Sequence, residues 1–229
     1  MDLTEKVVVI TGATRGLGKI LAKQFTKEHC KVVVSARTED ELMALAGKIH
    51  AEYFVADVID ERQVMDLGDF TVNKFGKIDV WINNAGIRIP HCPIEETDSK
   101  RFHEMMEVNL FGTFYGSKTA LIHMKSQKSG VIINILSTSA LEGRFNSAAY
   151  CASKYAAVGF GKSLRLEAEP HDISVIQIYP GGMKTNFFDE QKPKDYDEFM
   201  DAEYVAEKMI ENLKKDKPKI ELVVKRPGK

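Results

Sequence analysis

Tyr150 and Lys154 are the two residues whose types and spacing could support acid–base chemistry. They lie four positions apart in Tyr-Cys-Ala-Ser-Lys, at the start of an amphipathic segment. A helix there would place both side chains on one face. A phenol with an ordinary pKa of about 10 is a poor acid–base catalyst near neutrality. A neighbouring ammonium group favours the phenolate and would lower the Tyr150 pKa toward the useful range.

The same spacing occurs a second time, in Tyr204 and Lys208, so the pair alone does not identify a site. The residue thirteen positions before each tyrosine separates the two copies. Before Tyr150 it is Ser137, directly after an apolar run, whereas before Tyr204 it is Gln191, in a segment predicted to be a loop. Strand ends in open α/β sheets face the ligand crevice, so Ser137 could reach a substrate oxygen. A turn hydroxyl remains the alternative for Ser137, and Tyr204 is expected to be an ordinary helix-face aromatic.

A glycine-rich turn near the N-terminus is the second pattern with chemical meaning. The segment from Thr11 to Gly18 reads Thr-Gly-Ala-Thr-Arg-Gly-Leu-Gly and follows the apolar run 7–10. Such a strand, turn and helix can hold a pyrophosphate, because glycines let backbone N–H groups approach the anion and a helix N-terminus is positive. The spacing differs from the Gly-x-Gly-x2-Gly of most dinucleotide sites and indicates a particular branch of the fold. Taken alone, an ordinary turn explains it equally well.

The elements that must position these residues follow from apolar runs that alternate with amphipathic segments. The expected strands are 7–10, 32–34, 53–55, 78–82, 131–136, 174–178 and 220–224. The expected helices are 15–28, 39–49, 60–75, 99–126, 151–168 and 202–215, the second opened by a capping box at Thr38-Glu39-Asp40-Glu41. Continuous apolar runs suit strands buried on both faces. The alternation predicts an α/β fold, a Rossmann-type doubly wound parallel sheet of about seven strands with helices on both faces.

Composition excludes several function classes. Of the 229 residues, 44% are hydrophobic and 28% charged, as in soluble globular proteins. The net charge of −1 gives no field that favours nucleic acid or an anionic membrane. Cys30, Cys92 and Cys151 form no short pairing pattern, which predicts reduced thiols and a cytoplasmic location. No secretion signal, membrane-spanning stretch or metal-ligand motif is evident, so no metal site is expected.

In their order along the chain, these patterns resemble the short-chain dehydrogenase/reductase (SDR) family, in its short single-domain branch. Further matches are Asp57 after the third strand, Asn83-Asn84-Ala85-Gly86 after the fourth, and Pro180-Gly181 followed by Thr185. The resemblance covers essentially the whole chain. It implies one NAD(P)-binding Rossmann-fold domain over residues 1–229 with a substrate loop at about 183–200.

The resemblance also implies a catalytic tetrad of Asn109, Ser137, Tyr150 and Lys154. Tyr150 would give a proton to a carbonyl oxygen during reduction, or take one from an alcohol during oxidation. Ser137 would hold that oxygen, and Lys154 would lower the Tyr150 pKa and bind the nicotinamide ribose. Asn109 would anchor a water that links Lys154 to solvent, although by itself this residue reads as a kink or polar bridge in a helix. The hydride would come from the cofactor.

The cofactor site implied by the resemblance extends over many segments. Its residues are Gly12, Thr14, Arg15, Gly16, Leu17, Gly18, Arg37, Asp57, Val58, Asn84, Ala85, Gly86, Tyr150, Lys154, Pro180, Gly181 and Thr185. Ala36 stands where NAD-preferring relatives carry an aspartate that binds the ribose hydroxyls and repels a 2′-phosphate. Arg37 and Arg15 suit phosphate recognition. NADP(H) is therefore expected and NAD(H) less so, with two solvated turn arginines as the alternative.

The leading interpretation is an NADP(H)-dependent carbonyl reductase or alcohol dehydrogenase acting on a small molecule. The alternative is a non-catalytic NADP-binding sensor or regulator on the same fold, which would be expected to lose tetrad members. Sugar-nucleotide epimerases and dehydratases share Tyr-x3-Lys, but only 49 residues follow Pro180 here, and those enzymes usually carry a larger C-terminal domain. Gly159 and Gly161 in the fifth helix indicate close packing. The resemblance implies a homodimer or homotetramer, although packing of this helix on the sheet of its own chain would also explain the small residues. The loop aromatics Phe187, Phe188, Tyr196 and Phe199 are expected to pack the loop down rather than cover an apolar substrate.

Overall fold

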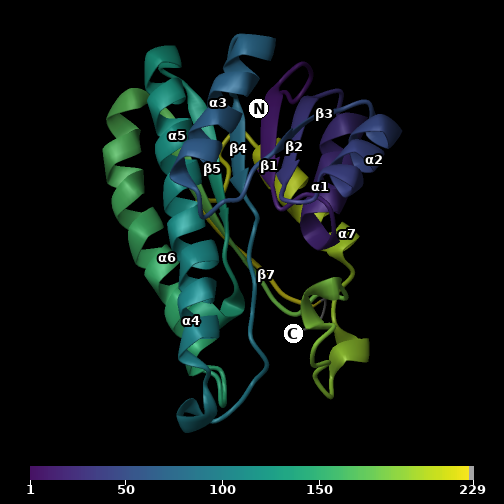
Figure 1. The fold of residues 1–229 in the computed structure, drawn as a ribbon. Helices are drawn as coiled ribbons and strands as arrows, with labels where there is room; N and C mark the ends of the chain where they lie inside the picture. Colours follow the sequence, from purple (N-terminus) through teal and green to yellow (C-terminus); the bar gives the residue numbers. More distant parts are fainter. Residues whose placement is uncertain (227–229) are drawn as a thin grey trace.

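Seven parallel strands form one sheet in the computed structural model, which describes residues 1–226. Figure 1 shows the arrangement of the sheet and its helices. The strands are β1 (Val7–Thr11), β2 (Lys31–Ala36), β3 (Glu52–Val55), β4 (Val80–Asn83), β5 (Gly130–Ile135), β6 (Ile173–Pro180) and β7 (Glu221–Val224). Their order is β3-β2-β1-β4-β5-β6-β7, and every neighbouring pair is parallel. The chain order reverses between β1 and β4, where a doubly wound sheet opens its ligand crevice. The predicted fold class is confirmed.

Helices cover both faces of the sheet, as Figure 1 shows. On one face lie α1 (Gly16–Lys27), α2 (Glu39–Ile49) and α7 (Ala202–Leu213). On the other lie α3 (Glu61–Phe75), α5 (Gly112–Gln127) and α6 (Ala148–Ala168), with α4 (Ser99–Met106) beside α6.

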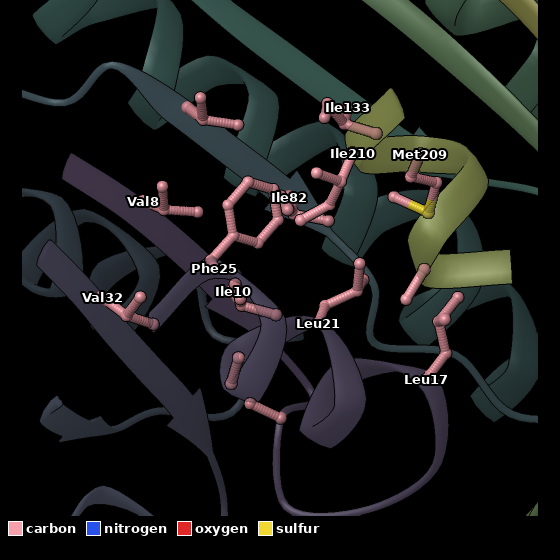
Figure 2. Packing of buried hydrophobic residues seen from close by; sticks show 14 of the residues in the cluster. Val8, Ile10, Leu17, Leu21, Phe25, Val32, Ile82, Ile133, Met209 and Ile210 are labelled. Carbon is pink, nitrogen blue, oxygen red and sulfur yellow. The ribbon is translucent and has the colours of Figure 1, made fainter. Parts of the chain in front are cut away.

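Alternate residues of β1 build the two halves of the core. Val8 and Ile10 belong to the cluster that contains Phe25 of α1 and Met209 of α7 (Figure 2). Val9, between them, belongs to the cluster on the opposite face. All five side chains are buried. Burial on both faces explains why the strands read as continuous apolar runs.

The single helix predicted over residues 99–126 is interrupted. The chain forms α4, then one wide turn of π-helix at Glu107–Phe111, then α5. Asn109 lies in that turn, and its side chain bonds to Ile87 and Ser153 in other segments. A π-turn of this kind often marks a functional position. These partners are distant in sequence, so local periodicity could not reveal the interruption.

The capping box predicted for α2 does not form. Thr38 is the N-cap residue, but its side chain accepts no capping hydrogen bond. Side-chain caps occur instead at α3 and α4, where Asp60 and Asp98 accept backbone N–H bonds from the first helical turn. Both are aspartates directly before the helix, a common capping choice that the sequence reasoning did not use.

Candidate active site

The glycine-rich turn leads from β1 into α1 and is pressed against the segment after β4. Gly12 has a φ of +63°, and a Cβ there would lie 2.7 Å from the Ala85 Cα, so both conformation and space require glycine. A Cβ on Gly18 would lie 2.4 Å from Asn84 Nδ2. The turn therefore offers an open backbone cradle of the kind that a pyrophosphate needs.

Thr11 and Asn84 tie the ends of β1 and β4 together at the switch point. Asn84 Nδ2 donates to the carbonyls of Thr11 at 2.8 Å and Gly12 at 3.0 Å. The Thr11 hydroxyl accepts from the backbone N–H groups of Asn84 and Ala85 at 3.1 and 3.2 Å. These bonds fix the cradle relative to the sheet before any ligand arrives.

A cleft of about 770 Å³ opens along the carboxyl edge of the sheet. This volume lies within the range of small-molecule and cofactor sites. Of the residues predicted to bind cofactor or substrate, all except Gly18 and Asn109 line it. Gly18 instead packs beneath the turn against Asn84. The sequence thus predicted a set of residues that the fold brings to one surface.

Ser137, Tyr150 and Lys154 line this cleft together. Ser137 follows β5, and its Oγ accepts the Ser139 N–H at 3.1 Å. Tyr150 and Lys154 lie one turn apart on α6, and Lys154 Nζ donates to the Ile135 carbonyl at 3.1 Å. Both α6 side chains line the same cleft as Ser137, so the three functional groups face one space.

Burial governs the titration of the two α6 groups. It raises the pKa of Tyr150 to about 12, against a hydrogen bond with Ser137 and the positive charges of Arg88 and Arg144. It lowers the pKa of Lys154 to about 8. The hydrogen bond with Ser137, followed by the charges of Arg88 and Arg144, supplies the lowering of the Tyr150 pKa that was expected from Lys154. Lys154 Nζ donates to the Ile135 carbonyl.

Asn109 lies behind the cleft wall and is 1% exposed. Its Oδ1 accepts the Ile87 N–H at 2.8 Å, and its Nδ2 donates to the Ile87 carbonyl at 2.9 Å and to Ser153 Oγ at 3.0 Å. A Cβ on Gly86 would come within 3.3 Å of Asn109 Oδ1 and 3.6 Å of Lys154 Nζ. Asn109 therefore fixes the segment against which the lysine lies.

The predicted cofactor-selecting arginines lie at the opposite end of the cleft. Arg37 follows β2, is 68% exposed and approaches Asp57 with 3.8 Å between Nη1 and Oδ2. Arg15 is the N-cap residue of α1. Both line the cleft, together with Ala36 and Glu41. The end beside β2 thus offers two guanidinium groups to a ligand, with one further carboxylate nearby.

The sequence prediction missed the basic side chains near Tyr150, because neither Arg88 nor Arg144 is among the predicted site residues. Both line the cleft with His91. The available signal was position, because Arg144 lies between Ser137 and Tyr150 in the sequence, where the chain cannot move far from either.

The loop aromatics pack on one another, as expected. Phe188 contacts Phe187, Tyr196 and Phe199 with ring centroids 5.1–6.1 Å apart. Phe187 also lies edge-on to Tyr150 at 6.0 Å, so the loop forms part of the cleft wall as well.

The second Tyr-x3-Lys pair lies apart from this site. Tyr204 and Lys208 are on α7, where Lys208 Nζ lies 5.5 Å from the Tyr204 ring and 2.8 Å from Glu211. Neither residue lines the cleft. Among the described residues, no group of three or more His, Cys, Asp or Glu side chains could hold a metal. Within the same part of the chain, no helix is long and apolar enough to span a membrane.

A doubly wound parallel sheet with a glycine cradle at its switch point, facing a Ser-Tyr-Lys group, defines an oxidoreductase of the Rossmann type. The family model described as short chain dehydrogenase matches residues 6–196. The chain belongs to the short-chain dehydrogenase family.

Curated relatives carry several activities. An L-fucose dehydrogenase from Oryctolagus cuniculus is 36% identical over 186 residues, which cover 81% of this chain and 65% of that protein. The match to this relative thus spans about two thirds of its length. A trans-4-hydroxycyclohexanecarboxylate dehydrogenase from Sinomonas cyclohexanicum is 37% identical over 80% of this chain and 74% of its own.

Solved structures share the fold closely and differ in the cofactor that they contain. An alcohol dehydrogenase from Thermococcus sibiricus complexed with 5-hydroxy-NADP has a TM-score of 0.89 and 27% identity, covering 98% of this chain and 97% of that one. A 3-ketoacyl-(acyl-carrier-protein) reductase from Brucella melitensis complexed with NADH has a TM-score of 0.91 and 29% identity, covering 97% of each chain.

Proposed function

We propose that this protein is an NADP(H)-dependent oxidoreductase that reduces a carbonyl group, or oxidises an alcohol, with Tyr150 as general acid and base. The observation that carries the proposal is the meeting of Ser137, Tyr150 and Lys154 in one cleft beside the glycine cradle. When bound, the nicotinamide cofactor supplies or accepts the hydride.

The chain's own groups would position the substrate and move the proton. Ser137 Oγ accepts the Ser139 N–H, which fixes the hydroxyl and leaves its proton to donate to the substrate oxygen. In the reductive direction Tyr150 gives its phenolic proton to that oxygen, and the positive charges near the ring stabilise the phenolate that results. Lys154, with a pKa of about 8, exchanges protons readily near neutrality and is suited to restore the phenol.

Preference for NADP(H) is proposed from the end of the cleft beside β2. Ala36 presents no carboxylate to repel a 2′-phosphate, and the exposed Arg37 guanidinium has only a long contact, 3.8 Å, with Asp57. Arg15 lines the same end. An arginine of this kind, not yet tightly paired, is free to bind phosphate with two N–H groups.

Substitution of Arg37 tests this preference. Arg37→Gln is expected to lower kcat/KM for NADPH by about tenfold to a hundredfold, the value of a charge-assisted hydrogen bond, with little effect on NADH. The measurement is the ratio of kcat/KM for the two cofactors. Arg62→Gln, which removes an exposed arginine of α3 outside the cleft, serves as the matched control. Equal use of NADH and NADPH by the wild type would contradict the NADP(H) assignment.

We further propose a homodimer or homotetramer that uses α5 and α6. Phe114 and Ile122 on α5, and Tyr155 and Leu166 on α6, follow helical spacing and are between 37% and 71% exposed. Exposed apolar stripes of this kind usually mark an interface. Among the described residues, no atom outside its own helix would lie within 4 Å of a Cβ on Gly159, which leaves room for a second backbone to approach.

The oligomer is tested by mass in solution. Sedimentation at micromolar concentration is expected to give two or four times 25.7 kDa, because a symmetric contact would bury these stripes. Leu166→Glu, which introduces charge at the most exposed of the four, is expected to shift the mass toward one chain, while Leu141→Glu outside the stripes leaves it unchanged. A wild-type mass of one chain would contradict the proposal.

The three thiols are free, which supports a reducing compartment such as the cytoplasm for the proposed enzyme.

A further inference from the structure

Three basic side chains line the cleft in the neighbourhood of Tyr150. Arg88 and His91 come from the segment after β4, and Arg144 comes from the segment that joins β5 to α6. The charges of Arg88 and Arg144 both favour the Tyr150 phenolate, which limits the rise in the Tyr150 pKa caused by burial. Both charges also lower the pKa of His91, after the larger effect of burial. The positive groups are therefore close to the phenol and to one another.

Arg88 has neutral partners. Its Nη1 and Nη2 donate to the Gln191 carbonyl at 3.1 Å and to Gln191 Oε1 at 3.4 Å, and its guanidinium lies 4.9 Å from the centre of the Phe188 ring. Within residues 1–226, no carboxylate lies within 4.0 Å of it, and the side chain is half-buried. Glu190 is close enough to act on Arg88, but it pairs with Arg101 at 2.7 Å. The charge of Arg88 is therefore not cancelled by a contacting carboxylate among these residues, and its remaining N–H groups can donate to an anion.

Arg144 is only partly neutralised. Its Nη2 lies 3.2 Å from Glu142 Oε1 and 3.3 Å from Thr138 Oγ1. The Glu142 side chain is 70% exposed, and an ion pair so open to water contributes little. The remaining N–H groups of Arg144 are available toward the cleft that it lines.

The other carboxylates that line the cleft do not cancel this charge. Asp57, which follows β3, lies beside Arg37, and Glu41 is in α2, which follows β2. Both β2 and β3 lie on the opposite side of the switch point from β5. Asp195 pairs with Arg226 at 2.8 Å. The arginines proposed for the cofactor phosphate and those beside Tyr150 therefore form two separate basic sites.

We infer that the substrate carries an anionic group, a carboxylate or a phosphate, which Arg88 and Arg144 bind while Ser137 and Tyr150 hold its reacting oxygen. This inference rests on the proposed carbonyl reduction. Guanidinium groups match the geometry of carboxylate and phosphate. The rings of Phe187 and Phe188 line the same space and would flank the apolar part that joins the two ends of the substrate.

The test compares three benzaldehydes whose para substituents differ in charge. The probes are 4-carboxybenzaldehyde, its neutral methyl ester methyl 4-formylbenzoate, and 4-formylphenyl phosphate, each with NADPH. The wild type is expected to show a kcat/KM at least about tenfold higher for one of the anions than for the ester. In Arg88→Gln and in Arg144→Gln the ratio of kcat/KM for the anion to kcat/KM for the ester is expected to fall about tenfold, whatever the change in ester turnover itself. An unchanged thermal unfolding temperature shows that each variant is folded. Arg88→Lys, which keeps the charge, is expected to retain part of the preference for the anion. Arg62→Gln is expected to retain all of this preference.

A binding measurement makes the inference independent of turnover. Calorimetric titration with 4-(hydroxymethyl)benzoate and its methyl ester, in the presence of NADPH, to which an alcohol cannot transfer hydride, is expected to show tighter binding of the anion in the wild type and its loss in Arg88→Gln. Anion binding without turnover would support the inference and sink the proposed function. Tyr150-dependent turnover with no preference for either anion would support the proposed function and contradict the inference. A rise in KM for NADPH, rather than for the aldehyde, in Arg88→Gln would assign the site to the cofactor and overturn the inference.

Discussion

Tyr150→Phe is expected to lower kcat by about 10²–10⁴-fold in both directions of the proposed reaction. Phenylalanine keeps the ring, and with it the edge contact to Phe187 at 6.0 Å, but removes the proton that the substrate oxygen must receive. The loss should therefore be in kcat, while NADPH affinity measured by cofactor fluorescence stays within about threefold of the wild type, because a proton-transfer group acts mainly in the transition state.

The chain contains its own control for this experiment. Tyr204 repeats the Tyr-x3-Lys spacing on α7, outside the cleft. Tyr204→Phe is expected to leave kcat unchanged. Equal rates for the wild type and Tyr150→Phe would remove Tyr150 from the mechanism. NADPH binding by a wild type that turns over no carbonyl compound would favour the sensor interpretation instead.

The fold was predictable because the strongest signals in the sequence are also the strongest physical constraints. Strands buried on both faces must be apolar at every position, as Val8, Val9 and Ile10 are, so their runs are visible without knowledge of their neighbours. Gly12 is equally constrained, by its positive φ and by the approach of Ala85. These features can be recognised in short stretches of sequence, although they determine the arrangement of the whole sheet.

The parts that escaped prediction depend on partners distant in sequence. In the π-turn, the Asn109 side chain forms hydrogen bonds with Ile87 and Ser153, which lie 22 and 44 residues away in the sequence. Arg144 is a different case, because it lies only six residues from Tyr150 but belongs to no helix, strand or recognised motif that would have marked its side chain. For a residue such as Arg144, its position between two predicted site residues indicates a place near the site, whereas its residue type alone does not.

The burial of Lys154 lowers the stability of the folded protein. It is 4% exposed, and its Nζ has the Ile135 carbonyl as its hydrogen-bond acceptor, at 3.1 Å. No carboxylate within residues 1–226 lies within 4.0 Å of it. A buried ammonium with one neutral acceptor destabilises the folded state, and its pKa falls to about 8 for that reason. The proposed role in proton transfer, rather than packing, would account for a lysine at this position, a common relation between stability and activity.

Lys154→Met is accordingly expected to abolish most of the activity and yet to raise the free energy of unfolding by about 2–3 kcal/mol at pH 7. Methionine has a similar length and no charge to bury. Unfolding in urea measures the difference, and Lys208→Met provides the control, because Lys208 is exposed on α7 and pairs with Glu211. That control variant is expected to change stability by less than about 0.5 kcal/mol.

The pH dependence of this difference identifies its cause. The folded pKa of Lys154, about 8, lies below the ordinary lysine pKa of 10.5 that applies to the unfolded chain. Between these values the unfolded wild type binds more protons than the folded form, so the contribution of Lys154 makes the wild type more stable as pH rises. Below pH 8 the burial penalty is fully present, and above 10.5 it is gone. The advantage of Lys154→Met should therefore be constant below pH 8 and shrink between 8 and 10.5, since every other titrating group is common to both proteins. A variant less stable than the wild type at pH 7, or a difference that does not vary with pH, would show that Lys154 is held by packing and not at the expense of a buried charge.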